Sequence, residues 1–393
     1  MITKHKTASQ LLSSISIFFL LLIQGCTLGV GGTASAPVIN PPGGIKYQAK
    51  SVTIATQTSG ANIYYTTDGT LPSSSNGNLY MGPITVNTNT TLRAIAVKEG
   101  IAVSEVAQET YSMRILILDR ENNRLVEIKD MSGTGWSTTT LSTDRPCDMA
   151  LDSRQRIYIV DRWNHRIARM DDFSGAGWIT WGVGILQYPI GIAIDTQDRI
   201  YISDQYNHRV VRIDDMTGAG FASYGSEGTG TGKFDYPCNI ALDSLGRIYI
   251  ADNWNGRIVR INDLSGAGWI SYGTYGTGGT QLNGPFGLAV ADDGKIYIGE
   301  AASNDYVNAW RLVRIDDMIG NGRIDLGILG NGINQFYQVQ KICIGSGTRL
   351  YLCDVSNHRI VRIDSMTGTG WTTFGTSGSG SNQFNRPHSI IGP

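Results

Sequence analysis

Six copies of a short motif of acidic residues and glycines resemble metal-binding loops at first sight. They read KDMSGTGW from 129, DDFSGAGW from 171, DDMTGAGF from 214, NDLSGAGW from 262, DDMIGNGR from 316 and DSMTGTGW from 364. A calcium loop needs several carboxylates at alternating positions, whereas each copy has at most two, and these are adjacent. Glycine adopts positive φ without strain, which suits a tight turn. We therefore expect six turns in which an acidic residue or a serine caps backbone N–H groups.

Three histidines raise a second prospect of metal chemistry, because each follows an acidic residue in a repeated loop. His165, His208 and His358 occupy the same position, as in the run from Asp204 to Arg209, where the acid and the arginine are five residues apart. A zinc ion holds its ligands at about 2 Å, and equivalent positions in separate repeats lie much farther apart. We interpret the histidines and the acid–arginine pairs as structural.

The same loops carry residues suited to binding an organic ligand. Three successive repeats have an aromatic side chain there, and a fourth is six residues longer and includes two more: Trp163, Tyr206, Trp254, Tyr306 and Trp310. Insertions in a repeat protein often mark its binding face, and large rigid side chains lose little entropy on binding. With Arg162, Gln205 and Asn253 as polar neighbours, this predicts a rim that binds a glycan, a peptide or an envelope partner. The alternative, that the aromatics only cover the loops, stays open.

A second candidate site is formed by polar side chains near the start of the first strand of four repeats. In the ring of repeats described below, these strands would surround a central channel and these residues would lie at its mouth: Asp148, Asn239, Lys341 and His388. Two oxygen ligands are fewer than the six or more that Ca²⁺ takes. The sequence also has no G-x-S-x-G, HExxH or P-loop motif, so no catalytic residue and no resident metal are predicted.

These residues are positioned by a unit that repeats from residue 113 onward. The second glycines of the six motifs are 42 to 54 residues apart, and the unit from 188 reads YPIGIAIDTQDRIYISDQYNHRVVRIDDMTGAGFASYGSEGTGTGKF. It contains four strand-length runs, and RIYIVD, RIYISD, RIYIAD, KIYIGE and RLYLCD are apolar at consecutive positions. Both faces of such strands must be covered, as they are between the blades of a β-propeller.

The two ends of the repeat region predict how the ring closes. The first unit, MRILILDRENNRLVEI, lacks an inner strand, and the chain ends on NRPHSIIGP, which matches an inner strand alone. Five whole units and one split unit make six blades, with the C-terminal strand completing the first.

The pattern resembles the NHL repeat, as seen in YPIGIAID, GRIYIAD, YNHRVVRI and SNHRIVRI. The resemblance extends over residues 113–393 and implies an all-β, six-bladed propeller of four-stranded blades. It does not imply one activity, because NHL-type propellers include lyases, RNA-binding modules and protein-interaction domains. Amidating-lyase relatives place three histidines around their cavity, of which this chain supplies only His388. The resemblance therefore implies, as the alternative function, a metal-assisted lyase or lactonase that uses calcium at the channel mouth.

Residues 37–112 have a different pattern, in which short strands such as SVTIATQT, ANIYYTT and TLRAIAVKEG are separated by Pro, Gly, Asn and Ser. This predicts a small β-sandwich. The stretch IYYTTDGTLPSSSNGNLYMGPITV resembles the chitobiase/hexosaminidase C-terminal-like domain, an immunoglobulin-like module. The resemblance implies a spacer without catalytic residues, with glycan binding as the alternative.

The N-terminus predicts export and a lipid anchor. Residues 1–25 begin with a basic segment, continue into an apolar run too short to span a membrane, and lead to LLIQGC. Ile23 to Cys26 resemble the lipobox of bacterial lipoproteins, which implies cleavage before Cys26 and acylation of that cysteine, with palmitate among the chains. Residues 26–36 would then be a flexible tether between the bilayer and an extracytoplasmic protein, in the outer membrane if the cell is Gram-negative. A plain secretory signal is the alternative.

The charge and cysteine content of the chain bear on its partners and its covalent links. The chain has 393 residues, a formal net charge of -1 and no run of Lys or Arg, so we expect no nucleic-acid partner. Four cysteines permit a disulfide in an oxidising compartment without fixing its pairing: Cys147, Cys238, Cys343 and Cys353. The sequence therefore predicts a monomeric, membrane-anchored binding protein that needs no cofactor.

Overall fold

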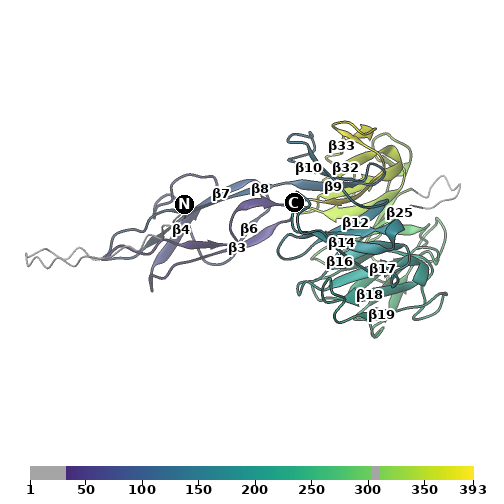
Figure 1. The fold of residues 1–393 in the computed structure, drawn as a ribbon. Coiled ribbons are helices and arrows are strands. Elements are labelled where there is room, and N and C mark those ends of the chain that lie inside the picture. Colours follow the sequence, from purple (N-terminus) through teal and green to yellow (C-terminus); the bar gives the residue numbers. More distant parts are fainter. Residues whose placement is uncertain (1–31, 302–309) are drawn as a thin grey trace, which may run out of the picture.

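The chain forms a small β-sandwich followed by a six-bladed β-propeller, as the repeat pattern predicted (Figure 1). The computed structural model describes residues 32–301 and 310–393. In these ranges the helical residues are three one-turn 3₁₀ helices: η1 (Arg162–Asn164), η2 (Gln205–Asn207) and η3 (Val355–Asn357). No helix in the same ranges is long and apolar enough to cross a membrane.

The sandwich consists of two packed sheets. One contains β1 (Val38–Asn40), β3 (Lys50–Ala55) and β6 (Ile84–Val86), and the other, in spatial order, β2 (Gly44–Lys46), β8 (Ala107–Met113), β7 (Thr90–Val97), β4 (Asn62–Thr66) and β5 (Asn78–Leu79). Leu92 and Tyr111 are fully buried in its core. Residues 33–35, expected in the flexible tether, instead bond to the sandwich, with Ala34 N donating to Ala102 O at 2.9 Å.

Each blade is a four-stranded antiparallel sheet, and in blades 2 to 6 the strands follow the chain from the channel outward. Blade 2 has β12 (Pro146–Leu151), β13 (Ile157–Asp161), β14 (Arg166–Met170) and β15 (Ile179–Trp181). Blade 3 has β16 (Pro189–Ile194), β17 (Ile200–Asp204), β18 (Arg209–Ile213) and β19 (Ala222–Tyr224). Blade 4 has β20 (Pro237–Leu242), β21 (Ile248–Asp252), β22 (Arg257–Ile261) and β23 (Ile270–Tyr272).

The last two blades carry short extra ladders in the loops after their fourth strands. Blade 5 has β24 (Pro285–Val290), β25 (Ile296–Glu300), β26 (Leu312–Ile315) and β27 (Ile324–Leu326), followed by the pair β28 (Ile328–Leu329) and β29 (Gln335–Phe336). Blade 6 has β30 (Val339–Ile344), β31 (Leu350–Asp354), β32 (Arg359–Ile363) and β33 (Thr372–Phe374), followed by the pair β34 (Thr376–Ser377) and β35 (Gln383–Phe384).

Blade 1 is assembled from both ends of the repeat region. From the channel outward it contains β36 (Pro387–Ile391), β9 (Ile115–Asp119), β10 (Arg124–Ile128) and β11 (Ser137–Thr140). β36 pairs antiparallel with β9, with Ile390 opposite Ile117 and Ile391 opposite Leu116. The inner strands of all six blades contact their neighbours in a closed ring. The C-terminal strand thus completes blade 1, as the sequence predicted.

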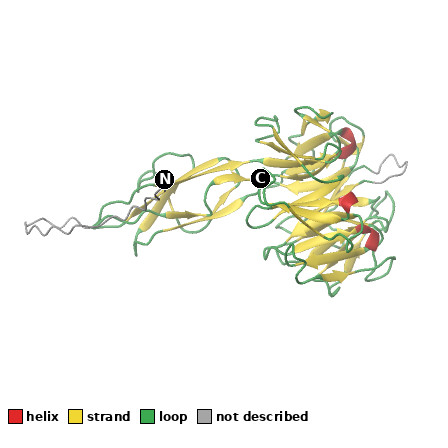
Figure 2. Cartoon of the chain, in the orientation of Figure 1, coloured by secondary structure: helices red, strands yellow, loops and turns green. Residues whose placement is uncertain are grey.

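The two faces of the propeller differ in what they carry. The loops between second and third strands lie with the connections between blades, since Trp163 N donates to Asp144 O at 3.3 Å. The sandwich packs on the opposite face, where Tyr47 Oη donates to Glu127 at 2.7 Å. Figure 2 shows the 3₁₀ turns on the side away from the sandwich. We call that side the upper face and the side toward the sandwich the lower face.

In each blade one buried acidic side chain joins the end of the second strand to the start of the third strand and to the connection from the preceding blade. We call this point the upper corner of the blade. In blade 3, Asp204 is fully buried and accepts hydrogen bonds from Arg209 Nε and from the backbone N of Gln187, both at 2.7 Å. The other blades have the same pair and the same backbone bond: Asp119–Arg124, Asp161–Arg166, Asp252–Arg257, Glu300–Arg311 and Asp354–Arg359. Buried charges require such pairing, so the repeated acid–arginine spacing is structural.

The six glycine motifs form the turns between third and fourth strands. In blade 3, Gly218 and Gly220 have φ of 84° and 64°. A Cβ on Gly220 would lie 2.0 Å from the Asp214 carboxylate. The hydroxyl and backbone N of Thr217 both donate to Asp215, and these bonds lower the pKa of Asp215. The motif is therefore a capped turn, as predicted.

Removing residues 387–393 should abolish the cooperative unfolding transition. The deletion exposes the edge of β9 and removes the buried side chains of Ile390 and Ile391, each worth roughly 1.5–3 kcal/mol. That is a large part of the net stability of a domain, about 5–15 kcal/mol. Thermal unfolding followed by circular dichroism measures the effect, with a chain lacking only Gly392 and Pro393 as control. An unchanged melting temperature in the larger deletion would contradict ring closure by β36.

Candidate functional site

The upper face carries exposed aromatic side chains at equivalent positions of three neighbouring blades. Trp163 and Tyr206 are the middle residues of η1 and η2, and Trp254 has the same place in the turn of blade 4. Each loop leaves a buried acid, turns once and returns to the paired arginine, so its middle residue stays at the surface. The three residues are 43%, 42% and 63% exposed.

Tyr188 and Tyr236 fill the gaps between these three side chains. Ring centroids are 5.5 Å apart from Trp163 to Tyr188, 4.7 Å from Tyr188 to Tyr206, 5.0 Å from Tyr206 to Tyr236, and 4.5 Å from Tyr236 to Trp254. We call these five residues the aromatic ribbon. Aromatic pairs at such spacings contribute about 0.5–1.5 kcal/mol each beyond their buried area, so the rings support one another in place.

The two tyrosines owe their positions to a left-handed backbone. Each precedes the proline that begins an inner strand, with φ of 48° at Tyr188 and 49° at Tyr236. Their backbone N–H groups donate to Nδ1 of His165 and His208, at 3.1 and 3.4 Å. This gives the repeated histidine its structural role. The signal that identifies the tyrosines in the sequence is the dipeptide Tyr-Pro at 188 and 236.

The predicted continuation of the exposed rim into blade 5 is wrong for Trp310. Its side chain is 7% exposed, and its ring packs edge-on against Tyr337 with centroids 4.9 Å apart. Trp310 immediately precedes Arg311, so it takes the position that His165 has in blade 2, the last residue of the loop, which packs against the next blade. Tyr306, the other residue predicted there, lies outside the described residues.

The polar neighbours of the ribbon are used inside the protein. Arg162 Nη2 donates to Gln205 Oε1 at 2.7 Å, and Gln205 Nε2 donates to the sulfur of Cys238 at 3.2 Å. Asn253 Nδ2 donates to Pro285 O at 3.0 Å. The ribbon thus presents mainly aromatic surface, and the amides of Gln205 and Asn253 hold the blades together beneath it.

Asp148, at the expected channel mouth, is the centre of a buried hydrogen-bond network. Its Oδ1 accepts from Met149 N at 2.9 Å and from Ser389 Oγ at 2.7 Å. Its Oδ2 accepts from Ile192 N at 3.1 Å and from Lys341 Nζ at 2.9 Å. The structure therefore brings Asp148 and Lys341 together, and the network joins blades 1, 2, 3 and 6 around the channel.

His388 and Asn239, the other two mouth residues, are buried beside this network without joining it. His388 Nδ1 lies 2.5 Å from Cys147 O, and its ring packs edge-on against Phe286. Burial, helped by nearby arginine charges, lowers the pKa of His388 well below its usual value, so the imidazole is neutral. Asn239 is 2% exposed, and its side-chain oxygen has no hydrogen-bond partner within the described residues.

The mouth residues do not fit a calcium ion. The Asp148 carboxylate already accepts four hydrogen bonds, Asn239 offers one oxygen, and Ca²⁺ takes 6–8 oxygen ligands. In residues 32–301 and 310–393 no three His, Cys, Asp or Glu side chains gather into a metal site. The four cysteines in these ranges are free thiols. Burial raises the pKa of Cys238 to about 12, which keeps its thiol protonated.

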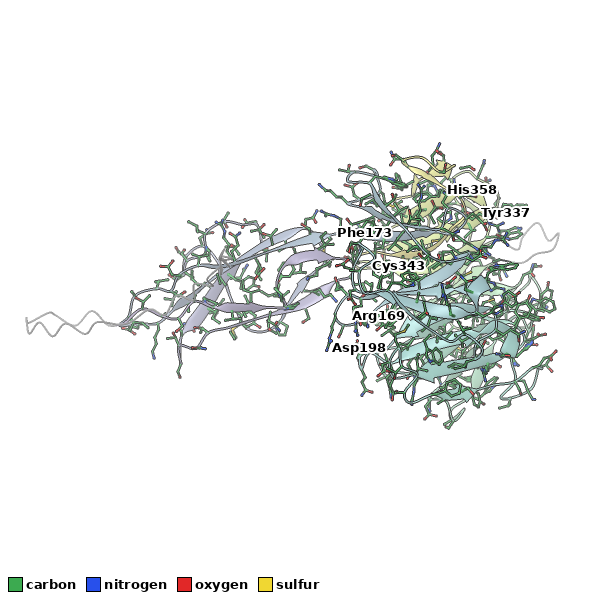
Figure 3. The ribbon with its side chains drawn as sticks, in the orientation of Figure 1. Arg169, Phe173, Asp198, Tyr337, Cys343 and His358 are labelled. Atoms are coloured by element: carbon green, nitrogen blue, oxygen red, sulfur yellow. The ribbon has the colours of Figure 1, made fainter. Side chains whose placement is uncertain are left out.

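Three cavities lie on the lower face, away from the ribbon. One of about 770 Å³ lies between the sandwich and blades 5 and 6, and Gln48 and Cys343 contribute to its lining. A second of about 450 Å³ lies between Tyr47 of the sandwich and Phe173 of the propeller. A third of about 260 Å³ forms the lower end of the channel and is also lined by Gln48 of the sandwich. Figure 3 shows Cys343 near the sandwich and Tyr337 near the opposite side. The sandwich therefore covers the lower end of the channel and not the upper face.

Comparison with protein families agrees with both parts of the fold. Residues 41–108 match the chitobiase/beta-hexosaminidase C-terminal domain, and residues 186–213 and 234–261 match the NHL repeat. The repeats matched belong to blades 3 and 4, which carry four of the five ribbon residues. None of the curated proteins matches the sequence.

Solved structures share the fold at low sequence identity. Two proteins of unknown function, from Bacteroides thetaiotaomicron and Bacteroides caccae, both give a TM-score of 0.52, at 15% and 12% identity. The first match covers 91% of this chain and 92% of its own, and the second 71% and 98%. Virginiamycin B lyase from Staphylococcus aureus gives 0.48 at 16% identity, covering 77% of this chain and 85% of its own. Function must therefore be argued from the site itself.

Replacing Asp148 by alanine should lower the free energy of unfolding by about 3–5 kcal/mol, because it leaves the Lys341 ammonium and other donors buried without a partner. Denaturant unfolding measures the change. The double variant Asp148→Leu, Lys341→Met should recover much of the loss, since replacing both members of a buried ion pair by apolar residues is often neutral. A loss under about 1 kcal/mol for Asp148→Ala, as for a surface ion pair, would contradict the role described here.

Proposed function

We propose that this propeller of NHL repeats is an extracytoplasmic carbohydrate-binding protein, which holds a glycan on the aromatic ribbon and is anchored to a bacterial membrane through Cys26. The observation that carries the proposal is the ribbon itself. Five aromatic rings follow one another across three blades, and Trp163, Tyr206 and Trp254 are 42–63% exposed. Exposed aromatic side chains gathered in one patch mark a binding surface in soluble proteins.

A saccharide suits this surface better than a folded protein partner. Sugar rings have flat C–H faces that pack on aromatic faces, and a row of rings one side chain wide matches an extended chain of them. A stable protein interface instead buries about 800 Å² on each partner around a central apolar core. Tyr and Trp provide large contact areas at low entropy cost. The sandwich matches a domain named after chitobiase and beta-hexosaminidase, enzymes of carbohydrate breakdown, which agrees with this choice.

The anchoring part of the proposal is supported by the sequence, since residues 1–31 lie outside the described residues. The lipobox-like segment ends at Cys26, and several acyl chains on one cysteine hold a protein firmly to a bilayer. The sandwich follows this segment and joins the propeller at its lower face (Figure 1). An anchor at Cys26 would therefore leave the ribbon on the side of the propeller away from the sandwich.

Trp163→Ala and Trp254→Ala should each weaken polysaccharide binding about tenfold, because truncating an aromatic anchor typically costs more than 1 kcal/mol. Both side chains are exposed, so the melting temperature should change little. Affinity electrophoresis against a panel of soluble polysaccharides identifies the ligands, and isothermal titration calorimetry measures the affinities.

Two further variants separate loss of the ribbon from loss of the fold. Phe221→Ala is the matched control, because Phe221 is 45% exposed but lies in a turn between third and fourth strands. Tyr236→Gly removes a ribbon ring without backbone strain, since Gly284 has the same position in blade 5 with a φ of 58°. Unchanged binding in all three ribbon variants, or no binding to any polysaccharide of the panel, would refute the proposal.

Cys26→Ser should release the protein from the membrane fraction of cells that express it, because the lipid attachment site is lost. Detergent phase partitioning and metabolic labelling with palmitate measure the change. Cys147→Ser is the control, since Cys147 is buried at the channel mouth and should leave both results unaltered. Labelling or membrane retention of the Cys26→Ser variant would place the anchor elsewhere.

A further inference from the structure

The rim that carries the aromatic ribbon continues into blades 1 and 2 with arginine in place of tyrosine. In every blade the residue before the inner strand has positive φ, and in blades 1 to 6 these residues are Arg386, Arg145, Tyr188, Tyr236, Gly284 and Gln338. The backbone position that presents a ribbon ring in blades 3 and 4 therefore presents a guanidinium group in blades 1 and 2.

Two further arginines, Arg120 and Arg162, begin the loops between second and third strands of the same two blades. We call Arg120, Arg145, Arg162 and Arg386 the arginine cluster. Three of its members act electrostatically on one point at the channel mouth: after burial, the charges of Arg120, Arg162 and Arg386 contribute to the lowered pKa of His388. The cluster is thus a local concentration of positive charge in a chain whose formal net charge is -1.

The negative charge beside the cluster does not balance it. Glu121 is the only carboxylate in the described residues that pairs with it, at 3.7 Å from Arg120 Nε and 3.6 Å from Arg145 Nε. Within the same residues Arg162 and Arg386 form no ion pair, and one buried side-chain nitrogen of each has no hydrogen-bond partner. The arginines of the blade corners, by contrast, each have a carboxylate within 2.9 Å.

The cluster and the ribbon are continuous. The guanidinium carbon of Arg145 lies 4.8 Å from the ring centroid of Trp163, and that of Arg162 lies 5.7 Å from the ring centroid of Tyr188. Cation–π contacts of about 0.5–1 kcal/mol at exposed sites position these side chains without neutralising their charge. The Arg145 side chain remains 46% exposed despite its ion pair with Glu121, so a ligand on the first ring of the ribbon also reaches this guanidinium group.

We propose that the arginine cluster binds anionic groups of the same polysaccharide that the ribbon holds, so that the ligand is an acidic polysaccharide bearing carboxylate or sulfate groups. The inference rests on the proposed carbohydrate binding and adds the charge of the ligand. Guanidinium groups offer paired N–H donors that match the oxygens of these anions. The four positive charges of the cluster also outnumber the two negative charges of Glu121 and of Asp144, which precedes Arg145.

Matched pairs of polysaccharides with and without charge test the inference on the full chain. Suitable pairs are polygalacturonate and its methyl ester, dextran sulfate and dextran, and carboxymethyl and hydroxyethyl cellulose. At least one acidic member should bind about tenfold more tightly than its neutral partner, as expected for a charge-assisted hydrogen bond, and this difference should shrink as salt is added. Titration calorimetry gives both affinities.

Charge-removing variants locate the effect. The double variant Arg145→Gln, Arg162→Gln should weaken binding of the acidic member about tenfold and that of the neutral member less, which removes the preference. Trp254→Ala should weaken binding of both members and keep the preference. Arg349→Gln is the control, because Arg349 is 38% exposed and forms an ion pair with Asp364 outside the rim, at 3.2 Å.

Three outcomes would overturn the inference at different levels. Equal affinity for both members of every pair that binds would refute the role of the arginine cluster and leave the ribbon as a neutral glycan site. Tighter binding of a single-stranded oligonucleotide than of every acidic polysaccharide would refute the class of ligand. No binding to any polysaccharide would refute the proposed function together with the inference.

Discussion

The structure depends on one buried interaction that is repeated in each blade. At the upper corner an acidic side chain accepts hydrogen bonds from an arginine side chain and from a backbone N–H group. Asp252 shows what this requires, since burial raises its pKa even though Arg257, Asn255 and the backbone of Asp235 all donate to it. A charge in such surroundings is tolerated only when its partners are all present. The acid therefore determines the path of the loop above it and of the strand entry beside it.

This constraint gives each residue of the upper loop a separate task. In blade 3 the first residue, Gln205, donates to Cys238 beneath the surface, and the third, Asn207, donates to the buried acid. The fourth, His208, accepts a hydrogen bond from the backbone N of Tyr236, just before the inner strand of the next blade. The side chain of the second residue has no part in the corner, and its type also differs from loop to loop: Glu121, Trp163, Tyr206, Trp254 and Ser356 in blades 1, 2, 3, 4 and 6. In these five loops the fold thus leaves the second position free for recognition, and in blades 1 and 2 the first position carries Arg120 and Arg162 of the arginine cluster.

The same logic explains how much the sequence could predict. Blade number, ring closure and the glycine turns follow from periodic patterns, because every blade must satisfy the same burial. Trp310 was misplaced because the insertion before it hides its position next to Arg311. Tyr188 and Tyr236 were missed because their exposure depends on a left-handed backbone, which no hydrophobic pattern reports. The arginine cluster was invisible for a different reason, since its members are spread from residue 120 to residue 386.

Ring closure is therefore also what builds the charged end of the rim. Arg386 directly precedes β36, and its backbone N donates to His358 Nδ1 of blade 6 at 3.2 Å. The strand that completes blade 1 thus carries one arginine of the cluster to the blade that supplies Arg120. Aromatic rings then follow on one side in blades 2 to 4, whereas Ser356 occupies the free position on the other side. A chain-like ligand laid along this rim meets a surface with a direction, charged at one end and aromatic at the other.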